Sequence, residues 1–357
     1  MLTRPFSLVS VSICSLVALA PPVLTGCESP AKSKPDAAPK STTDASTPTA
    51  TTPIAASVLR ERAIEVIEAE INDPDASIRA STAAAAALTP ARLGHIIEKG
   101  LSDTNSGVRG VTAMAIGRGQ IKGYANRLTP LLQDPETITQ VAATFALIRT
   151  GVDVDRSPLA SWLLNDPSPW VKRQAADVLG LLGDKSAMPI LKTAARQKFP
   201  TLGPEQSKIL SLLLAEAMIR LGDDSQRPVI RAALYPATPD ELEAAALAVT
   251  IIGAIQDREA VAQLIYLTEY RDKAGQQYPA EVRLAAAQTL AKLGKPQGYF
   301  IADQYVNSTN PVHRAQAAAV YGATKGPQNN QRLDALLNDP VSLVRVAAAD
   351  AVLRGAK

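Results

Sequence analysis

The chain has 357 residues, a formal net charge of +3 at pH 7 and an aromatic content of 4%. This nearly balanced charge excludes a strong general attraction to nucleic acid or to anionic lipid, and the scarcity of aromatic residues argues against an aromatic-lined cofactor pocket. Alanine is frequent throughout, which favours closely packed short helices over a β-rich fold.

The N-terminal segment has the features of an export signal. Arg4 precedes an apolar run over residues 6–20, and the sequence LTGC follows at residues 24–27. This segment resembles a bacterial lipoprotein signal peptide, whose final cysteine is acylated and becomes the first residue of the mature protein. A retained membrane anchor is disfavoured, because Pro21 and Pro22 interrupt the run before the roughly 20 apolar residues that a spanning helix needs. We therefore expect a signal peptide at residues 1–26 and lipidation of Cys27, with an ordinary secretory signal as the alternative.

The chain contains two cysteines, Cys14 within the expected signal peptide and Cys27 at the expected acylation site. The exported protein would then hold neither a free thiol nor a disulfide, which suits an oxidising envelope compartment. Because the exported protein would keep no free cysteine, catalytic sites with a cysteine nucleophile and metal sites with cysteine ligands are excluded as well.

Residues 27–54 form an expected linker. Beyond Cys27 the segment consists almost entirely of Ser, Thr, Pro, Ala, Lys and Asp, so it lacks apolar side chains to bury and should be disordered. A coil of about 26 residues spans roughly 25 to 30 Å. We expect the folded part of the protein to stay close to the membrane while floating free of it.

From residue 55 to residue 357 one pattern recurs. An Asp is followed five residues later by Ile or Val, six residues later by Arg or Lys, and then by an Ala-rich apolar run. The clearest copies begin at Asp73, Asp103, Asp166 and Asp339, and looser copies bring the Ile or Val positions to 78, 108, 138, 171, 210, 242, 282, 312 and 344. A period of about 30 residues sustained over the whole segment predicts a solenoid rather than several separate domains.

Each period contains two helical patterns, so about nine helix pairs are expected. In the second helix of the fourth copy, Val171, Ala175 and Val178 lie at spacings that form one apolar stripe, and Gly183 follows where the helix should end. Alanines in these helices allow close approach of neighbours. The predicted fold is therefore all-α.

The recurring Asp and Arg predict a structural ladder. The Asp lies in the turn before each second helix, where a carboxylate accepts backbone N–H groups and favours the helix N-terminus. The basic side chain six residues later can reach the carboxylate of an adjacent turn. A catalytic pair would occur once, whereas this pair recurs. The expected rungs are Asp73 with Arg79, Asp103 with Arg109, Asp166 with Lys172, and Asp339 with Arg345.

The pattern D-P-x-x-x-V-R-x-x-A-A-x-x-L at this period resembles HEAT repeats, and most closely the short HEAT-like repeats first named from phycobilisome lyases. The resemblance covers about residues 55 to 357. It implies a right-handed α-solenoid, or superhelix, of helix pairs whose second helices line the concave face. Such solenoids mostly bind other macromolecules.

We expect no metal, cofactor or nucleic acid. HEAT-like enzymes resembling deoxyhypusine hydroxylase hold two irons with repeated His-Glu pairs, whereas His95 and His313 stand alone here and neither is followed by Glu. Bilin lyases give the repeat its name, but the repeat itself carries no chromophore chemistry. On the expected concave face Arg173 and Arg314 are isolated cations, whereas phosphate backbones require many.

Two long intervals between repeats suggest partner-binding loops. Insertions at residues 196–207 and 270–281 precede second helices, so both should emerge from the same edge of the solenoid. Tyrosines gather near the second insertion, and tyrosine is favoured at protein interfaces, although it also packs between helices. The expected partner-binding residues are Phe199, Tyr270 and Tyr278 in the insertions, with Gln140, Arg173 and Arg314 on the concave face.

These features favour a non-enzymatic, membrane-tethered scaffold that binds other proteins of the bacterial cell envelope. The alternatives are a bilin-lyase-like enzyme or assembly factor, and a passive structural spacer. Glu28 after the acylated cysteine favours the periplasmic side of the outer membrane if the cell has one. The last helix, near residues 344–355, carries no obviously polar cap, so self-association through this end is a further expectation.

Overall fold

The computed structural model describes residues 54–236, 238–271, 275–324 and 326–355. The expected signal peptide, Cys27 and most of the expected linker lie outside these residues. Within the described residues, no helix is long and apolar enough to cross a membrane.

The described chain folds into nine helix pairs, and the one β contact among these residues is an isolated bridge between Arg271 and Gln277. The first helices of the pairs are α2 (Ala56–Glu70), α4 (Pro90–Leu101), α6 (Ala125–Leu128) continued by η1 (Thr129–Gln133), α8 (Ser157–Asn165), α10 (Met188–Arg196), α12 (Arg227–Ala232), α14 (Val261–Glu269), α16 (Tyr299–Tyr305) and α18 (Pro327–Leu337). The second helices are α3 (Ala76–Ala86), α5 (Ser106–Gly119), α7 (Thr137–Arg149), α9 (Pro169–Leu182), α11 (Pro204–Arg220), α13 (Leu242–Ala254), α15 (Ala280–Lys292), α17 (Pro311–Ala323) and α19 (Ser342–Gly355). The expected all-α solenoid of about nine helix pairs is confirmed.

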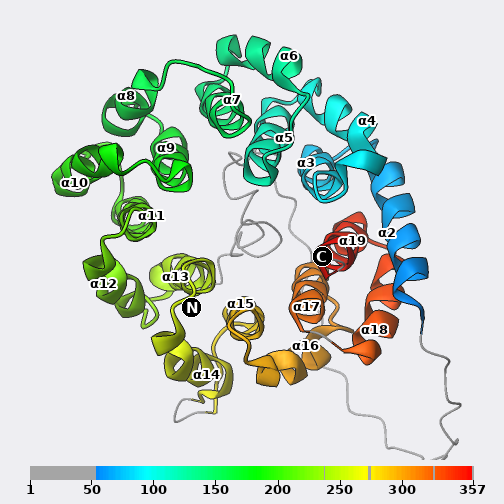
Figure 1. Cartoon of the computed structure of the whole chain (residues 1–357). Helices are drawn as coiled ribbons and strands as arrows, with labels where there is room; N and C mark the ends of the chain where they lie inside the picture. The colour runs from blue at the N-terminus through cyan, green and yellow to red at the C-terminus, as the bar shows by residue number, and fades with distance from the viewer. Residues whose placement is uncertain (1–53, 237, 272–274, 325, 356–357) are drawn as a thin grey trace, which may run out of the picture.

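The solenoid closes into a ring. Figure 1 shows the second helices on the inside and the first helices on the outside, with the red C-terminal pair beside the blue N-terminal pair. Helix α19 packs against both α2 and α3, and α18 packs against α2. The last helix, through which self-association was expected, is thus covered by α2 and α3 of the same chain.

Small residues allow the inner helices to pack closely. A Cβ atom on Gly180 of α9 would lie 2.7 Å from the Cα atom of Ala217 in α11, and one on Gly322 of α17 would lie 2.7 Å from the Cβ atom of Ala351 in α19. Both distances are too short for a side chain, so these helix pairs depend on glycine. The Ala-rich composition thus sets the short distance between neighbouring repeats.

The expected ladder is present, but each arginine reaches forward to the next repeat. Arg79 donates from Nε and Nη2 to the carboxylate of Asp103, at 2.8 and 2.9 Å, and from Nη1 to the backbone carbonyl of Asp73, at 2.9 Å. Arg109 binds the Asp134 carboxylate and the Asp103 carbonyl in the same way. The guanidinium therefore joins two successive turns. Within its own turn, the carboxylate of Asp73 or Asp103 accepts the backbone N–H two residues later, that of Asp75 or Asn105.

One expected rung differs. The Nζ atom of Lys172 is buried and donates to the carbonyls of Leu163 and Leu164, at 3.3 and 3.0 Å, rather than forming an ion pair with Asp166. An ammonium lacks the planar fork of donors with which a guanidinium spans its own turn and binds the next carboxylate in a bidentate manner. The Asp166 carboxylate instead accepts the backbone N–H of Ser168, at 2.8 Å.

The same ladder closes the ring. Arg345 of α19 donates from Nη1 to the carbonyl of Asp339, at 2.8 Å, as other rungs do, and from Nε to the Glu70 carboxylate at the end of α2, at 2.7 Å. Glu70 thus takes the place of the next repeat's aspartate. A second ion pair across this seam joins Arg62 of α2 to Asp334 of α18.

We predict that Arg109→Ala lowers the free energy of unfolding by about 3 kcal/mol, because it leaves the buried Asp134 carboxylate without its cation. The Asp134 side chain is 3% exposed, and that of Arg109 is 16% exposed. The ring should persist with faster hydrogen exchange in α5 and α7, since repeat contacts are local. Chemical denaturation and hydrogen exchange measure both effects.

The matched control is Arg92→Ala. Arg92 pairs with Glu61, but the two side chains are 56% and 54% exposed, so the loss should stay below about 1 kcal/mol. Equal losses in the two variants would contradict a stabilising role for the ladder.

Candidate functional site

Four tyrosines lie in contact along the outside of two neighbouring repeats. Tyr235 follows α12, Tyr266 lies in α14, and Tyr270 and Tyr278 belong to the insertion after α14. The distances between successive ring centroids are 6.3, 5.0 and 5.4 Å, and the rings are tilted by 42 to 52° from one another. We call Tyr235, Tyr266, Tyr270 and Tyr278 the tyrosine row.

Local structure brings these side chains together. Tyr266 and Tyr270 are four residues apart, which places them on one face of α14 and its C-terminal end. The insertion then folds back: Arg271 forms the antiparallel bridge with Gln277, and Gly275 has a φ of +78° that few other residues adopt. This reversal returns the chain so that Tyr278 packs against Tyr270.

The tyrosine row is partly exposed, and no described residue forms a hydrogen bond with its hydroxyls. Tyr235 is 50% exposed and Tyr266 is 43% exposed. Among the described residues no hydrogen bond involves a hydroxyl of the row, whereas the buried Tyr321 donates to Asp303, at 2.7 Å, and the Tyr305 hydroxyl accepts a bond from Arg283. The hydroxyls of Tyr305 and Tyr321 thus have hydrogen-bond partners within the described fold, whereas the four hydroxyls of the tyrosine row have none there.

Partial burial and neighbouring phenols raise the pKa of Tyr266 and of Tyr278. Both hydroxyls therefore stay protonated at neutral pH and can donate as well as accept hydrogen bonds. An exposed group of aromatic rings with free hydroxyls offers the contacts that protein interfaces use most.

The other insertion has a packing role in the described structure. Phe199 is partly buried against the hydrophobic core, and the Nζ atom of Lys172 lies 4.3 Å from its ring centroid. A cation over an aromatic face stabilises the buried ammonium. Residues 196–207 thus present no counterpart of the tyrosine row.

Two residues expected on the concave face lie in the ladder. Gln140 donates to the carbonyl of Asp134, at 2.7 Å, and Arg314 binds the carboxylate of Asp339 and the carbonyl of Ser308. Both are six residues after the turn residue whose carbonyl they bind, which is the ladder position. The repeat positions expected at 138 and 312 lie one residue too early in these two copies, so the sequence pattern does not reveal this role.

Arg173 lies in a mixed-charge group at the start of the inner helices. It is 5% exposed, its guanidinium lies 4.8 Å from the ring of Trp170, and its Nε atom has no hydrogen-bond partner in the described structure. Burial lowers the pKa of Arg173, while the charges of Glu243 and Glu205 oppose this change. The three side chains come from α9, α11 and α13.

Further inner charges pair with one another. Arg118 of α5 binds Asp177 of α9, at 2.7 Å, across the intervening helix α7, and Glu216 binds Arg220 within α11. Burial raises the pKa of Glu216. The described inner face is therefore mixed in sign rather than a continuous cationic surface of the kind that binds nucleic acid.

The histidines lie apart. His95 is exposed on α4, and His313 contacts Glu281, at 3.2 Å, Ser308 and the ring of Tyr305. Within the described ranges, no three His, Cys, Asp or Glu side chains gather in a way that could hold a metal ion.

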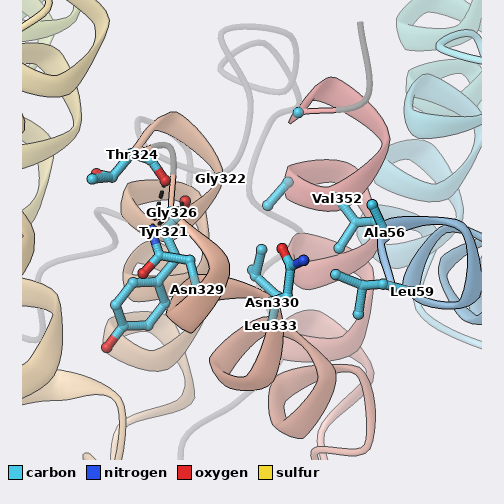
Figure 2. A pocket seen from close by; sticks show the side chains of 12 residues that line it. Ala56, Leu59, Tyr321, Gly322, Thr324, Gly326, Asn329, Asn330, Leu333 and Val352 are labelled. Carbon is cyan, nitrogen blue, oxygen red and sulfur yellow. Dashed lines mark hydrogen bonds between the residues drawn. The ribbon is translucent and has the colours of Figure 1, made fainter. Parts of the chain in front are cut away.

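A cavity of about 280 Å³ lies at the ring seam, between α2, α17, α18 and α19. Figure 2 shows Ala56, Leu59 and Val352 on one side and Tyr321, with its hydroxyl pointing away, on the other. The amide of Asn329 is already bound to the carbonyls of Tyr321 and Thr324. This lining offers packing surface but no pair of free acid and base groups.

A comparison with protein families supports the repeat architecture in part of the chain. Residues 125–202 match the family model of HEAT repeats. The complex of CpcE and CpcF of phycocyanin lyase from Nostoc is similar at 13% identity, covering 74% of this chain and 99% of that chain, with a TM-score of 0.42. Human deoxyhypusine hydroxylase in complex with glycerol is similar at 17% identity, covering 84% and 98%, with a TM-score of 0.34. An engineered protein is similar at 16% identity, covering 85% and 95%, with a TM-score of 0.32.

No curated protein matches the sequence of the chain. The expected resemblance to HEAT repeats is confirmed by the family model over residues 125–202.

We predict that Glu243→Gln raises the melting temperature at neutral pH. Burial and a hydrogen bond with Glu205 raise the pKa of Glu243 above its ordinary value of 4.5. Its stabilising contribution is therefore fully present below about pH 4.5 and is lost as pH rises through the higher folded pKa. The glutamine mimics the neutral acid, so thermal melts from pH 4 to 7 should show a smaller pH dependence in this variant.

Glu269→Gln, on the exposed end of α14, is the control and should leave this pH dependence unchanged. A Glu243→Gln protein that is less stable at neutral pH would show that the ionised carboxylate stabilises the fold.

Proposed function

We propose that this protein is a non-catalytic scaffold of the bacterial cell envelope that binds another protein through the tyrosine row. The observation that carries the proposal is the row itself: four touching tyrosine rings, half exposed at Tyr235 and Tyr266, with hydroxyls that no described residue binds. Large, rigid side chains with free polar ends contribute strongly to protein interfaces at a low entropic cost.

The surroundings of the row suit a binding surface. Tyr266 is carried by α14, whose inner side is fixed in the core through Leu264 and Leu267. A rigid support keeps the rings in contact before a partner arrives, so little conformational entropy is lost on binding. The row lies on the outer helices, which leaves it accessible without opening the ring (Figure 1).

The cellular part of the proposal rests on the sequence. Acylation of Cys27 would hold the ring near a membrane, on the periplasmic side of the outer membrane if the cell has one. The partner would then be an envelope protein. A scaffold needs no catalytic group, and no cofactor enters this function.

We predict that a photoreactive amino acid at Tyr266 in the full chain captures one recurrent envelope protein in cells. Adding Tyr235→Ala and Tyr270→Ala should weaken binding of that partner about 30-fold, which corresponds to the roughly 2 kcal/mol of an interface hot spot. Mass spectrometry identifies the captured protein, and pull-down with the purified partner measures the affinity.

The matched control position is Tyr299, an exposed tyrosine on α16 outside the row, which is 41% exposed. Capture of the same protein from both positions, or of none from Tyr266, would contradict the binding role and favour a passive spacer.

In the same cells the full chain should sediment with membranes and its Cys27→Ser variant should not.

A further inference from the structure

We infer that Arg258 and Lys295 form a site for the phosphate group of a membrane lipid, with the rings of Tyr299 and Phe300 in contact with the lipid beside it. The inference goes beyond the proposed function and does not depend on the tyrosine row. It rests on an ion pair that recurs between repeats and is missing at one place, on a cavity at that place, and on two exposed aromatic rings next to it.

The turns that lead from one repeat to the next carry a second series of ion pairs, separate from the ladder. Each pair joins a cation of one repeat to an aspartate in the following turn. The pairs are Arg156 with Asp184 at 3.4 Å, Lys192 with Asp223 at 3.4 Å, and Arg231 with Asp257 at 2.6 Å. Each of the three aspartates directly precedes a short 3₁₀-helix that leads into the next outer helix.

The next turn breaks this pattern. Lys295 directly precedes the short helix η6 (Pro296–Gly298), where the three earlier turns have aspartate. In the turn before it, Arg258 corresponds to Arg156, since both directly follow an aspartate. Arg156 pairs with the aspartate of the following turn, whereas Arg258 is followed there by a lysine. Both Arg258 and Lys295 are exposed, and neither forms an ion pair with a carboxylate of the described chain.

A cavity of about 370 Å³ lies between these two turns. It is lined by the two cations, by Val261 at the start of α14, and by Leu293 and Gly294 after the end of α15. Gly294 has a φ of +78°, and the position of an added Cβ atom is open, with no neighbouring atom within 4 Å. The lining thus holds two positive side chains and no carboxylate of the described residues. An anion bound here would take the place that aspartate has in the earlier turns.

The backbone that carries Lys295 is held in place by α15. The N–H group of Lys295 donates to the carbonyl of Leu290, at 2.8 Å. A Cβ atom on Gly298 would lie 2.8 Å from the Cα atom of Ala287, so the turn packs against α15 more closely than a side chain would allow. Because the cation projects from a fixed turn, binding of an anion costs little backbone entropy.

Two exposed aromatic rings stand next to the cavity. Tyr299 and Phe300 begin α16, directly after η6, and are 41% and 40% exposed. A 3₁₀-helix rises about 2 Å per residue, so Tyr299 lies within about 8 Å of Lys295 along the chain. Cations beside aromatic rings suit the headgroup region of a membrane, where the rings meet the acyl boundary and the cations meet phosphates. A soluble phosphate would use the cations alone, so the rings favour a lipid.

This contact orients an anchored ring and does not hold a free one. Each basic side chain near an anionic membrane raises the affinity only about fivefold, so two of them give weak binding. The Cys27→Ser variant should therefore still leave the membrane fraction. Val261 begins α14 and Tyr270 follows its end, so the cavity and the tyrosine row lie at opposite ends of this helix. A lipid and a protein partner can thus be bound together.

The test is a phosphorus NMR titration of the purified full chain with dihexanoyl phosphatidylglycerol below its micelle concentration, and separately with inorganic phosphate. Arg258→Gln with Lys295→Gln should weaken binding of both probes by about tenfold or more, because the charge-assisted hydrogen bonds to phosphate are lost. Tyr299→Ala with Phe300→Ala should weaken binding of the lipid about fivefold and leave binding of phosphate unchanged, since the rings meet only the lipid.

The matched control is Arg156→Gln with Lys185→Gln, which removes two exposed cations from turns of the same kind where Asp184 is present. It should leave both affinities unchanged. Equal losses in the two cation variants, or binding that does not depend on Arg258 and Lys295, would overturn the site. Binding of both probes that is lost with the cations but is insensitive to the aromatic variant would assign the site to a soluble phosphate and overturn the lipid.

A second arm tests the contact in cells. A photoreactive amino acid at Phe300 of the full chain should form phospholipid adducts, and their yield should fall about tenfold in Arg258→Gln with Lys295→Gln. The control position is Val229 on α12, which is 43% exposed. Adducts in equal yield from both positions, or from neither, would contradict the inference. Tyr266→Ala with Tyr270→Ala should leave the adducts unchanged, so the outcome is independent of the scaffold role.

Discussion

The structure depends on one repeated interaction, an arginine that joins the turn of its own repeat to the carboxylate of the next. The guanidinium is suited to this task because it presents several donors in a fixed plane. The link has the same form in Arg79, Arg109 and Arg314. Nη1 donates a hydrogen bond to a carbonyl of the preceding turn, and Nε and Nη2 donate to the carboxylate of an aspartate 24 or 25 residues later. Each rung therefore fixes both the turn and the spacing to its neighbour.

This link occurs at Arg79, Arg109 and Arg314, whereas Gln140 and Lys172 bind only backbone carbonyls. Small inner residues bring neighbouring helices close, and the nine described pairs complete a ring (Figure 1). At the seam Arg345 binds Glu70, where the other arginine rungs bind an aspartate. Closure removes the open ends that solenoids otherwise need to cap.

Much of this could be predicted from the sequence, because the ladder follows a fixed spacing. The distance of six residues from Asp73 to Arg79 predicted the turn and a basic side chain that reaches an adjacent turn, but not that the bound carboxylate is that of Asp103. Glu70 gave no such signal, since it belongs to a helix end and its partner lies 275 residues away. Tyr270 and Tyr278 were expected in a binding loop, but the contributions of Tyr235 and Tyr266 depend on packing between α12 and α14.

The most direct test of this account is a double-mutant cycle between Glu70 and Arg345, using Glu70→Gln, Arg345→Ala and the double variant in chemical denaturation. A closed ring predicts a coupling free energy of about 1 to 3 kcal/mol, as for residues in direct contact. The same cycle at Arg314 and Asp339, an internal rung, supplies the reference value. Additive effects at Glu70 and Arg345, together with clear coupling at the internal rung, would show that the ladder exists but that the ring is open.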